Sequence, residues 1–269
     1  PTPSRASSKD GTILRTEIGS QEDAGIASLL DRHQVDLFIG IGLPVESRRG
    51  RPWRYTTSHL EREPDWLLVF RDLQSAVYLR EGERNENNLG RIAAYYQSVG
   101  VPFDRERGFD VVRVLEKNPT WAIEHGMAPL DFPGLVRAWQ RGSVRQKRVA
   151  GNRLAATWAA LGAYERALLV DDGWQTPSSI SPVDLSRQRR SLWCLLRLDR
   201  LGPALERAEV LAAHPSMDRI TRQLIASTRK YATSKSPQER AEIAALSTLF
   251  SRRERGELKG VQRRPPIRR

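Results

Sequence analysis

The first group of residues that could carry chemistry is acidic and surrounds Pro64: Glu61, Glu63 and Asp65. Neighbouring carboxylates can hold a divalent cation or act as a general acid and base. A nuclease-like metal site would also need a Lys close to these acids, and no Glu-x-Lys follows them on a predicted strand. We therefore interpret the three acids as solvated loop charges.

A second acidic group lies in the segment FDRERGFD, where Asp104, Glu106 and Asp110 could orient a sugar or a metal. Arg105 and Arg107 alternate with these acids. Interleaved opposite charges on a loop neutralise one another, and this is the interpretation that we favour. A pocket lined by Asp104 and Asp110 with raised pKa values would instead indicate an enzyme.

The other candidate groups are isolated along the chain. Gly40-Ile41-Gly42 lacks the third glycine of a dinucleotide-binding loop, because Val45 occupies its place. Cys194, which has no second cysteine to pair with, lies among apolar residues and is interpreted as a small buried side chain. The histidines have no second ligand at helical spacing, so no metal site is predicted at His33, His59, His125 or His214.

The chain has a formal net charge of +12, from 44 Lys and Arg against 32 Asp and Glu. A cationic surface attracts nucleic acids, acidic proteins and anionic membranes. The cations are densest at 141–153 and 252–269, and neither cluster contains the interleaved aromatic residues on which single-stranded nucleic acids stack. We therefore expect acidic protein subunits, or an anionic membrane surface, before nucleic acid.

These side chains must be positioned by two kinds of structure. The segment 192–215 predicts two helices joined by a tight turn at Gly202-Pro203, and 154–170 is a rougher copy in which Ala167 matches Ala204, 37 residues on. This offset is close to the ~34-residue period of tetratricopeptide repeats. Helices are expected near 121–139, 148–161, 163–171, 183–200, 203–213, 217–232 and 237–255, with Trp158 and Trp193 in the core.

In the N-terminal half, the spacing of apolar residues changes between helical and strand periods about every ten residues. A helix over 22–33 precedes a buried strand over 35–45, and two short strands at 66–70 and 75–80 form a hairpin before a helix at 87–97. The fold class is therefore α+β, a small α/β region followed by an all-α, tetratricopeptide-like solenoid of helical hairpins. The predicted boundaries are an arm over 1–20, the α/β domain over 21–118, the repeats over 119–255 and a basic tail over 256–269.

The segments LLDRHQVDLFI at 29–39 and DWLLVFRDLQSAVYLR at 65–80 resemble the soluble C-terminal domain of bacterial multi-pass membrane glycosyltransferases of the mannosyltransferase type. Val35-Asp36, Trp66, Asp72 and Arg80 match the pattern of that family. The resemblance covers about 60 residues. It implies a soluble appendage outside the cytoplasm, with no catalytic residue carried over, because the catalytic part of the family lies in its membrane region.

We expect a non-catalytic scaffold or protein–protein interaction subunit of a larger, membrane-associated assembly, without cofactor or metal. The alternatives are an accessory domain of a glycan-processing glycosyltransferase and a nucleic-acid-binding protein. Because no apolar run reaches the ~18 residues of a membrane span, we predict a soluble chain, periplasmic and peripheral to a membrane or else cytoplasmic. The predicted partner-binding residues are Trp174, in the polar insertion 171–182, and the cations Arg141, Arg145, Arg148, Arg252, Arg253, Arg263 and Arg264.

Overall fold

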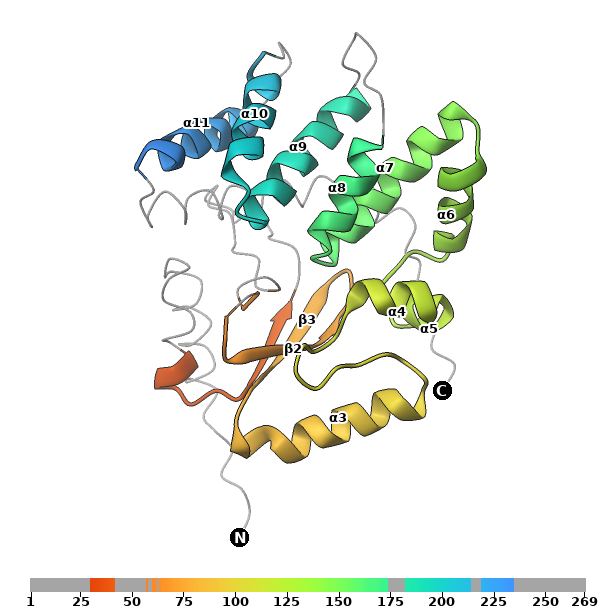
Figure 1. The fold of residues 1–269 in the computed structure, drawn as a ribbon, viewed down its shortest axis with the longest axis vertical. Coiled ribbons are helices and arrows are strands. Elements are labelled where there is room, and N and C mark those ends of the chain that lie inside the picture. Colours follow the sequence, from red (N-terminus) through yellow and green to blue (C-terminus); the bar gives the residue numbers. More distant parts are fainter. Residues whose placement is uncertain are drawn as a thin grey trace, which may run out of the picture.

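A computed structural model describes residues 30–41, 57, 60, 61, 63–173, 182–213 and 219–234 of the chain. In this part, a three-stranded antiparallel sheet is followed by helices that pack in pairs. The predicted α+β class, with a small sheet region and then helical hairpins, is confirmed. Figure 1 shows the sheet between one long helix on one side and a row of helices on the other.

The sheet consists of β1 (Leu37–Ile41), β2 (Trp66–Arg71) and β3 (Ser75–Arg80) in the order β1-β3-β2. The predicted hairpin is therefore confirmed as β2 and β3. Asp72 closes its turn, because its Oδ1 accepts hydrogen bonds from the backbone N–H groups of Gln74 and Ser75, both at 2.6 Å. β1 lies within the strand predicted over 35–45, and residues 42–45 fall outside the described residues. The prediction that this strand is buried is wrong, because Leu37, Ile39 and Ile41 are exposed on one face of the sheet.

Alternating side chains of the sheet serve two separate cores. On one face, α3 (Glu86–Ser98) places Leu89 and Ile92 against Leu67, Val69 and Leu79. The opposite face contributes the buried cluster of Leu30, Phe38, Leu60, Trp66, Ala76 and Tyr78. The short 3-10 turn η2 (Glu83–Asn85) connects β3 to α3.

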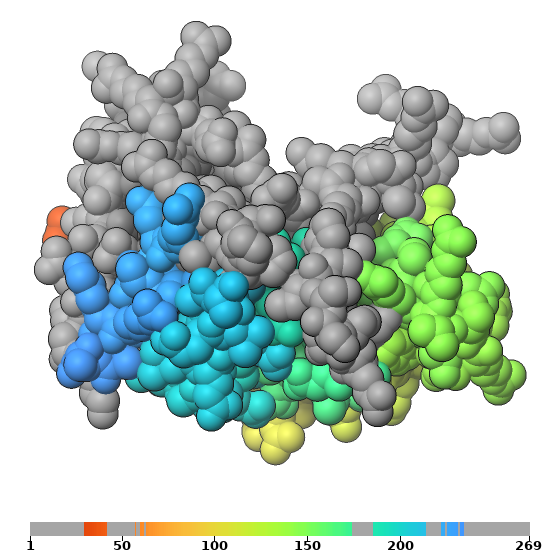
Figure 2. Space-filling model, turned by 90° about the horizontal axis from the view of Figure 1, so that it is seen from above, coloured from red at the N-terminus to blue at the C-terminus, as the bar shows by residue number. Residues whose placement is uncertain are grey.

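The helical region stacks helix on helix in chain order. Close packing joins α6 to α7, α7 to α8, α8 to α9, α9 to α10 and α10 to α11. Seen from above, α10 and α11 lie beside each other at one end of the row, with α6 and α7 at the other end (Figure 2). The helices are α4 (Val111–Lys117), α5 (Pro119–Glu124), α6 (Phe132–Arg141), α7 (Val144–Ala160), α8 (Tyr164–Asp172), α9 (Pro182–Arg197), α10 (Leu201–Ala212) and α11 (Arg219–Ser234).

Two predicted helix boundaries are wrong. The helix expected over 121–139 is divided into α5 and α6, because Gly126 takes a left-handed φ of 74° and Pro129 follows it. α7 begins at Val144 rather than 148, since Ser143 and Gln146 form a capping box there. Of the helix predicted over 22–33, residues 30–32 are helical and 22–29 lie outside the described residues. The arm over 1–20, the helix over 237–255 and the basic tail over 256–269 also lie outside them.

The two predicted hairpin turns have different outcomes. In the upstream hairpin, Leu161-Gly162-Ala163-Tyr164 is predicted as the turn, and the structure confirms a turn between α7 and α8, with Gly162 at a φ of 79°. The prediction of a turn at Gly202-Pro203 is wrong. α9 ends at Arg197, Asp199 takes a left-handed φ of 58°, and α10 begins at Leu201, so Gly202 and Pro203 lie in its first turn.

The matched positions of the two hairpins are buried. Ala167 and Ala204 are both 0% exposed, and the predicted core positions Trp158, Trp193 and Cys194 are buried as well. The largest core cluster extends from Leu73 to Ile225 and takes side chains from both sides of residue 118. The domain boundary at that residue stays a prediction.

Candidate functional site

The most elaborate polar site lies where the sheet meets the hairpins, around the carboxylate of Glu61. Its oxygens accept hydrogen bonds from the Tyr164 hydroxyl at 2.9 and 3.1 Å and from Arg197 Nη2 at 2.5 Å. Arg71, at the end of β2, donates to the same carboxylate through Nη1 and to the Ala160 carbonyl through Nη2 at 3.2 Å. The side chains of Arg71 and Glu61 are only 2% and 16% exposed.

Charge around Glu61 shifts its pKa. Burial alone would raise the pKa of this carboxyl, but Arg197 and Arg71 outweigh burial through their charges and hydrogen bonds, so the pKa lies below its ordinary value of 4.5. Glu61 is therefore an ionised acceptor and not a proton donor at neutral pH. We call Glu61, Arg71, Tyr164 and Arg197 the junction cluster.

The interpretation of Glu61 as a solvated loop charge is wrong. Glu63 is half-buried and Asp65 is exposed, so only the first acid of the group enters the interior. The partners of Glu61 are 10, 103 and 136 residues away along the chain. No local pattern in the sequence could identify them.

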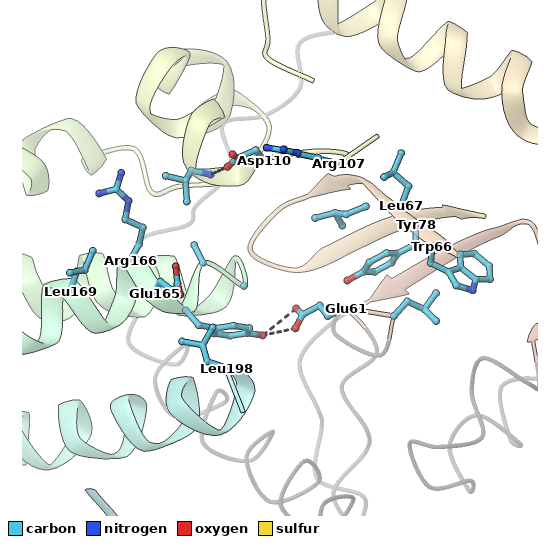
Figure 3. Close-up of a pocket in the computed structure, with 16 residues that line it drawn as sticks. Glu61, Trp66, Leu67, Tyr78, Arg107, Asp110, Glu165, Arg166, Leu169 and Leu198 are labelled. Carbon is cyan, nitrogen blue, oxygen red and sulfur yellow. Dashed lines mark hydrogen bonds between the residues drawn. The ribbon is translucent and has the colours of Figure 1, made fainter. Parts of the chain in front are cut away.

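A cavity of about 740 Å³ opens beside the junction cluster, between the sheet and α8 (Figure 3). This volume is in the range of small-molecule sites. In Figure 3, dashed lines at Glu61 mark the two hydrogen bonds from the Tyr164 hydroxyl, and Trp66 and Tyr78 come from the strands of the sheet. The apolar lining of the cavity includes Leu60, Leu67, Leu68, Val112, Ala163, Leu169 and Leu198.

The charged groups that line this cavity have structural partners. Glu165 pairs with Arg200 at 2.6 Å, and Arg166 pairs with Glu116. Asp110 accepts hydrogen bonds from the backbone N–H groups of Val112 at 3.0 Å and Arg113 at 3.1 Å, which caps α4. Glu165 and Asp110 therefore take part in an ion pair and a helix cap.

Asp104 and Asp110 do not form the acid pair that an enzyme hypothesis would require. Backbone hydrogen bonds from Arg107 and Glu106 lower the pKa of Asp104, and only Asp110 lines the cavity. The predicted mutual neutralisation in this loop is also incomplete, because Arg105 pairs with Glu86 of α3. Asp104 accepts backbone hydrogen bonds within its own turn, and Asp110 caps α4.

A second buried ion pair lies deeper among the hairpins. Arg190 of α9 donates to both oxygens of Asp171 in α8, at 2.6 and 2.9 Å, and both side chains are 1% exposed. Burial raises the pKa of Asp171, and the charge of Arg190 acts in the opposite direction. The pair joins consecutive hairpins, with Asn152 of α7 accepting from Arg190 at 3.0 Å.

The structure brings three of the predicted partner-binding cations together at the turn between α6 and α7. Arg141 ends α6, and Arg145 and Arg148 lie in the first turns of α7. Arg141 and Arg145 are exposed and Arg148 is half-buried. The other predicted partner-binding residues, Trp174, Arg252, Arg253, Arg263 and Arg264, lie outside the described residues.

Four of the residues that carry the family resemblance, Val35, Asp36, Trp66 and Arg80, lie together at one end of the sheet, whereas Asp72 lies in the β2–β3 turn. The Arg80 backbone N–H donates to the Asp36 carbonyl at 2.9 Å, and Arg80 Nε donates to the Val35 carbonyl at 3.0 Å. The Arg80 guanidinium lies 4.8 Å from the centre of the Trp66 ring. The pattern is therefore explained by sheet architecture.

Within the described residues, no group of three or more His, Cys, Asp or Glu side chains could hold a metal ion. Nor does any helix in this part of the chain have the length and apolar character needed to cross a membrane. Comparisons with protein-family models, with curated proteins and with solved structures found no match to this chain.

Proposed function

We propose that this protein is a non-catalytic interaction subunit that presents a stack of helical hairpins to other proteins of a larger assembly. The observation that carries the proposal is the packing of α6 to α11, in which each helix packs closely on its neighbours in chain order. Such nearest-neighbour packing is typical of repeat proteins, whose extended surfaces bind partner chains.

The chemistry of the interior also supports this proposal. The buried charges at Glu61 and Asp171 are held by arginines from neighbouring elements. The ion pairs of Glu61 connect the sheet to α9, and the ion pair of Asp171 connects α8 to α9. An interaction platform gains from this rigidity, because less ordering entropy is lost when a partner binds.

Exposed aliphatic side chains on the second helix of two consecutive hairpins give a surface to test. Leu169 of α8 is 65% exposed and Val210 of α10 is 45% exposed. The tagged chain would be purified from its source organism, and the stoichiometry of any co-purifying protein would be measured by light scattering. We expect the variant Leu169→Glu/Val210→Glu to lose that protein.

A matched control lies on the opposite side of the molecule. Tyr95 and Val99, in and directly after α3, are 48% and 38% exposed, so Tyr95→Glu/Val99→Glu changes charge and polarity equally. The complex should survive this change. A chain that purifies alone at all concentrations, or that loses its partner equally in both variants, would contradict the proposal.

The second candidate is an accessory domain of a membrane glycosyltransferase. It rests on the sequence resemblance of 29–39 and 65–80, four of whose residues, Val35, Asp36, Trp66 and Arg80, lie together at one end of the sheet. The same purification tests it. The candidate predicts that the co-purifying protein is a multi-pass membrane glycosyltransferase.

A further inference from the structure

The segment that contains the turn between α6 and α7 is rich in cations and has no acidic residue in its sequence. Residues 132–164 contain six Lys or Arg and no Asp or Glu. Of these cations, Arg153 is held by Asp131 at the far end of α6, at 2.5 Å. The other five surround the turn, and we call them, with Val144 and Val149, the basic corner: Arg137, Arg141, Arg145, Lys147 and Arg148.

Helical spacing directs most of these side chains outward. Arg137 and Arg141 are four residues apart on α6 and both are exposed. On α7, Arg145 and Val149 are also four apart and exposed. The corner lies at the outer edge of the helical row, at the upper right of Figure 1.

Aliphatic side chains lie among the cations. Val144 is 85% exposed, the largest exposure of the large hydrophobic residues in the described part of the chain, and Val149 is 57% exposed. Both belong to a helix whose other face is packed into the core through Ala150 and Leu154. Neither valine contributes much to folding, because little of its apolar surface is removed from water.

Arg141, at the end of α6, suits the dipole of that helix, but cations at the start of α7 do not suit the dipole of α7. Its first turn contains no acidic residue, and Ser143 and Gln146 already cap it. Positive charges at a helix N-terminus oppose the helix dipole and destabilise the helix slightly. A surface that departs from a local stability rule is a candidate for function.

We propose that the basic corner binds the anionic surface of a phospholipid bilayer, with the arginines at the headgroups and Val144 and Val149 in the interface below them. A projecting corner of cations and aliphatic side chains fits a flat anionic surface, whereas an acidic protein partner would need a matching hollow. This inference goes beyond the protein-binding function and does not depend on it.

The experiment measures co-sedimentation of the purified chain with vesicles of phosphatidylcholine alone and with vesicles that contain about 30 mol % phosphatidylglycerol. Binding is expected only to the anionic vesicles, and it should weaken as salt rises from about 0.1 M to about 1 M. Each cation near an anionic surface strengthens binding about fivefold, so Arg137→Gln/Arg141→Gln/Arg145→Gln should bind about 100-fold more weakly.

Matched variants separate the corner from the overall charge. Arg84, Arg91 and Arg222 are exposed cations on other elements, and their triple change to Gln should leave vesicle binding within about twofold. Replacing Arg137, Arg141 and Arg145 with Lys keeps the charge and should preserve binding, which excludes a folding effect. Val144→Ser/Val149→Ser should reduce binding several-fold.

Three results would overturn the inference: equal binding to both kinds of vesicle, equal loss in both Gln triples, or no binding to anionic vesicles at low salt. Stronger competition by an acidic protein or by nucleic acid than by the anionic vesicles would also count against it. None of these results bears on whether a partner co-purifies through α8 and α10, so the two proposals fail separately.

Discussion

At the scale of single residues, Glu61 holds the sheet and the hairpins together. It is bound by Arg71 and Arg197, and its side chain is 16% exposed. Glu61→Gln leaves two arginine charges without their counter-charge, so we expect the free energy of unfolding to fall by about 3 kcal/mol. Urea denaturation measures this change, and the exposed Glu106→Gln should alter stability by less than about 0.5 kcal/mol.

The same residue predicts how stability depends on pH. The pKa of Glu61 is lowered in the folded protein, so its contribution is fully present above its unfolded value of 4.5 and is lost as the pH falls through the folded pKa. The stability difference between the wild-type chain and Glu61→Gln should therefore be largest above pH 4.5 and shrink below it. A difference that stays constant from neutral to strongly acidic pH would contradict this assignment.

At the scale of elements, the glycines Gly162 and Gly202, both predicted to lie in hairpin turns, have different roles. Gly162 has a φ of 79°, and a Cβ there would lie 2.7 Å from Arg71 Nη1. Gly162→Ala should therefore destabilise the protein by about 1–3 kcal/mol through backbone strain and crowding of the junction cluster.

Gly202, in the first turn of α10, provides the matched control. A Cβ there would meet no atom within 4 Å, and its φ is not left-handed. Gly202→Ala should stabilise the helix by about 0.5 kcal/mol, because it restricts the unfolded chain. Thermal unfolding of both variants checks the pair, and a shift in the same direction for both would contradict this difference between the two glycines.

At the scale of the whole molecule, the sheet and the hairpins should unfold together. The main core cluster extends from Leu73 to Ile225, and the junction cluster connects β2 with α9. Hydrogen exchange should therefore give the same free energy of opening for amides of β3 and of α9, and Glu61→Gln should lower both equally. Exchange in α9 while β3 stays protected would instead indicate two independent domains, as the predicted boundary at 118 implies.

Several elements were determined by the sequence alone. The β2–β3 hairpin follows from two apolar runs around Asp72, and the α7–α8 turn follows from Gly162 between apolar helical stretches. Apolar periodicity also identified Trp158, Trp193 and Cys194 as core. These predictions succeed because they depend on contacts and dihedral preferences within a few residues.

The tertiary structure decided which polar residues belong together. Glu61 carries the same local signals as the exposed Asp65, and only packing brings Tyr164 and Arg197 to its carboxylate from 103 and 136 residues away. The basic corner was visible as a run of cations, and a break between helices was predicted over 140–147, but the structure narrows this break to 142–143, so that the cations belong to two helices. A sequence pattern specifies the period of an element, whereas burial and charge pairing depend on which elements meet in space.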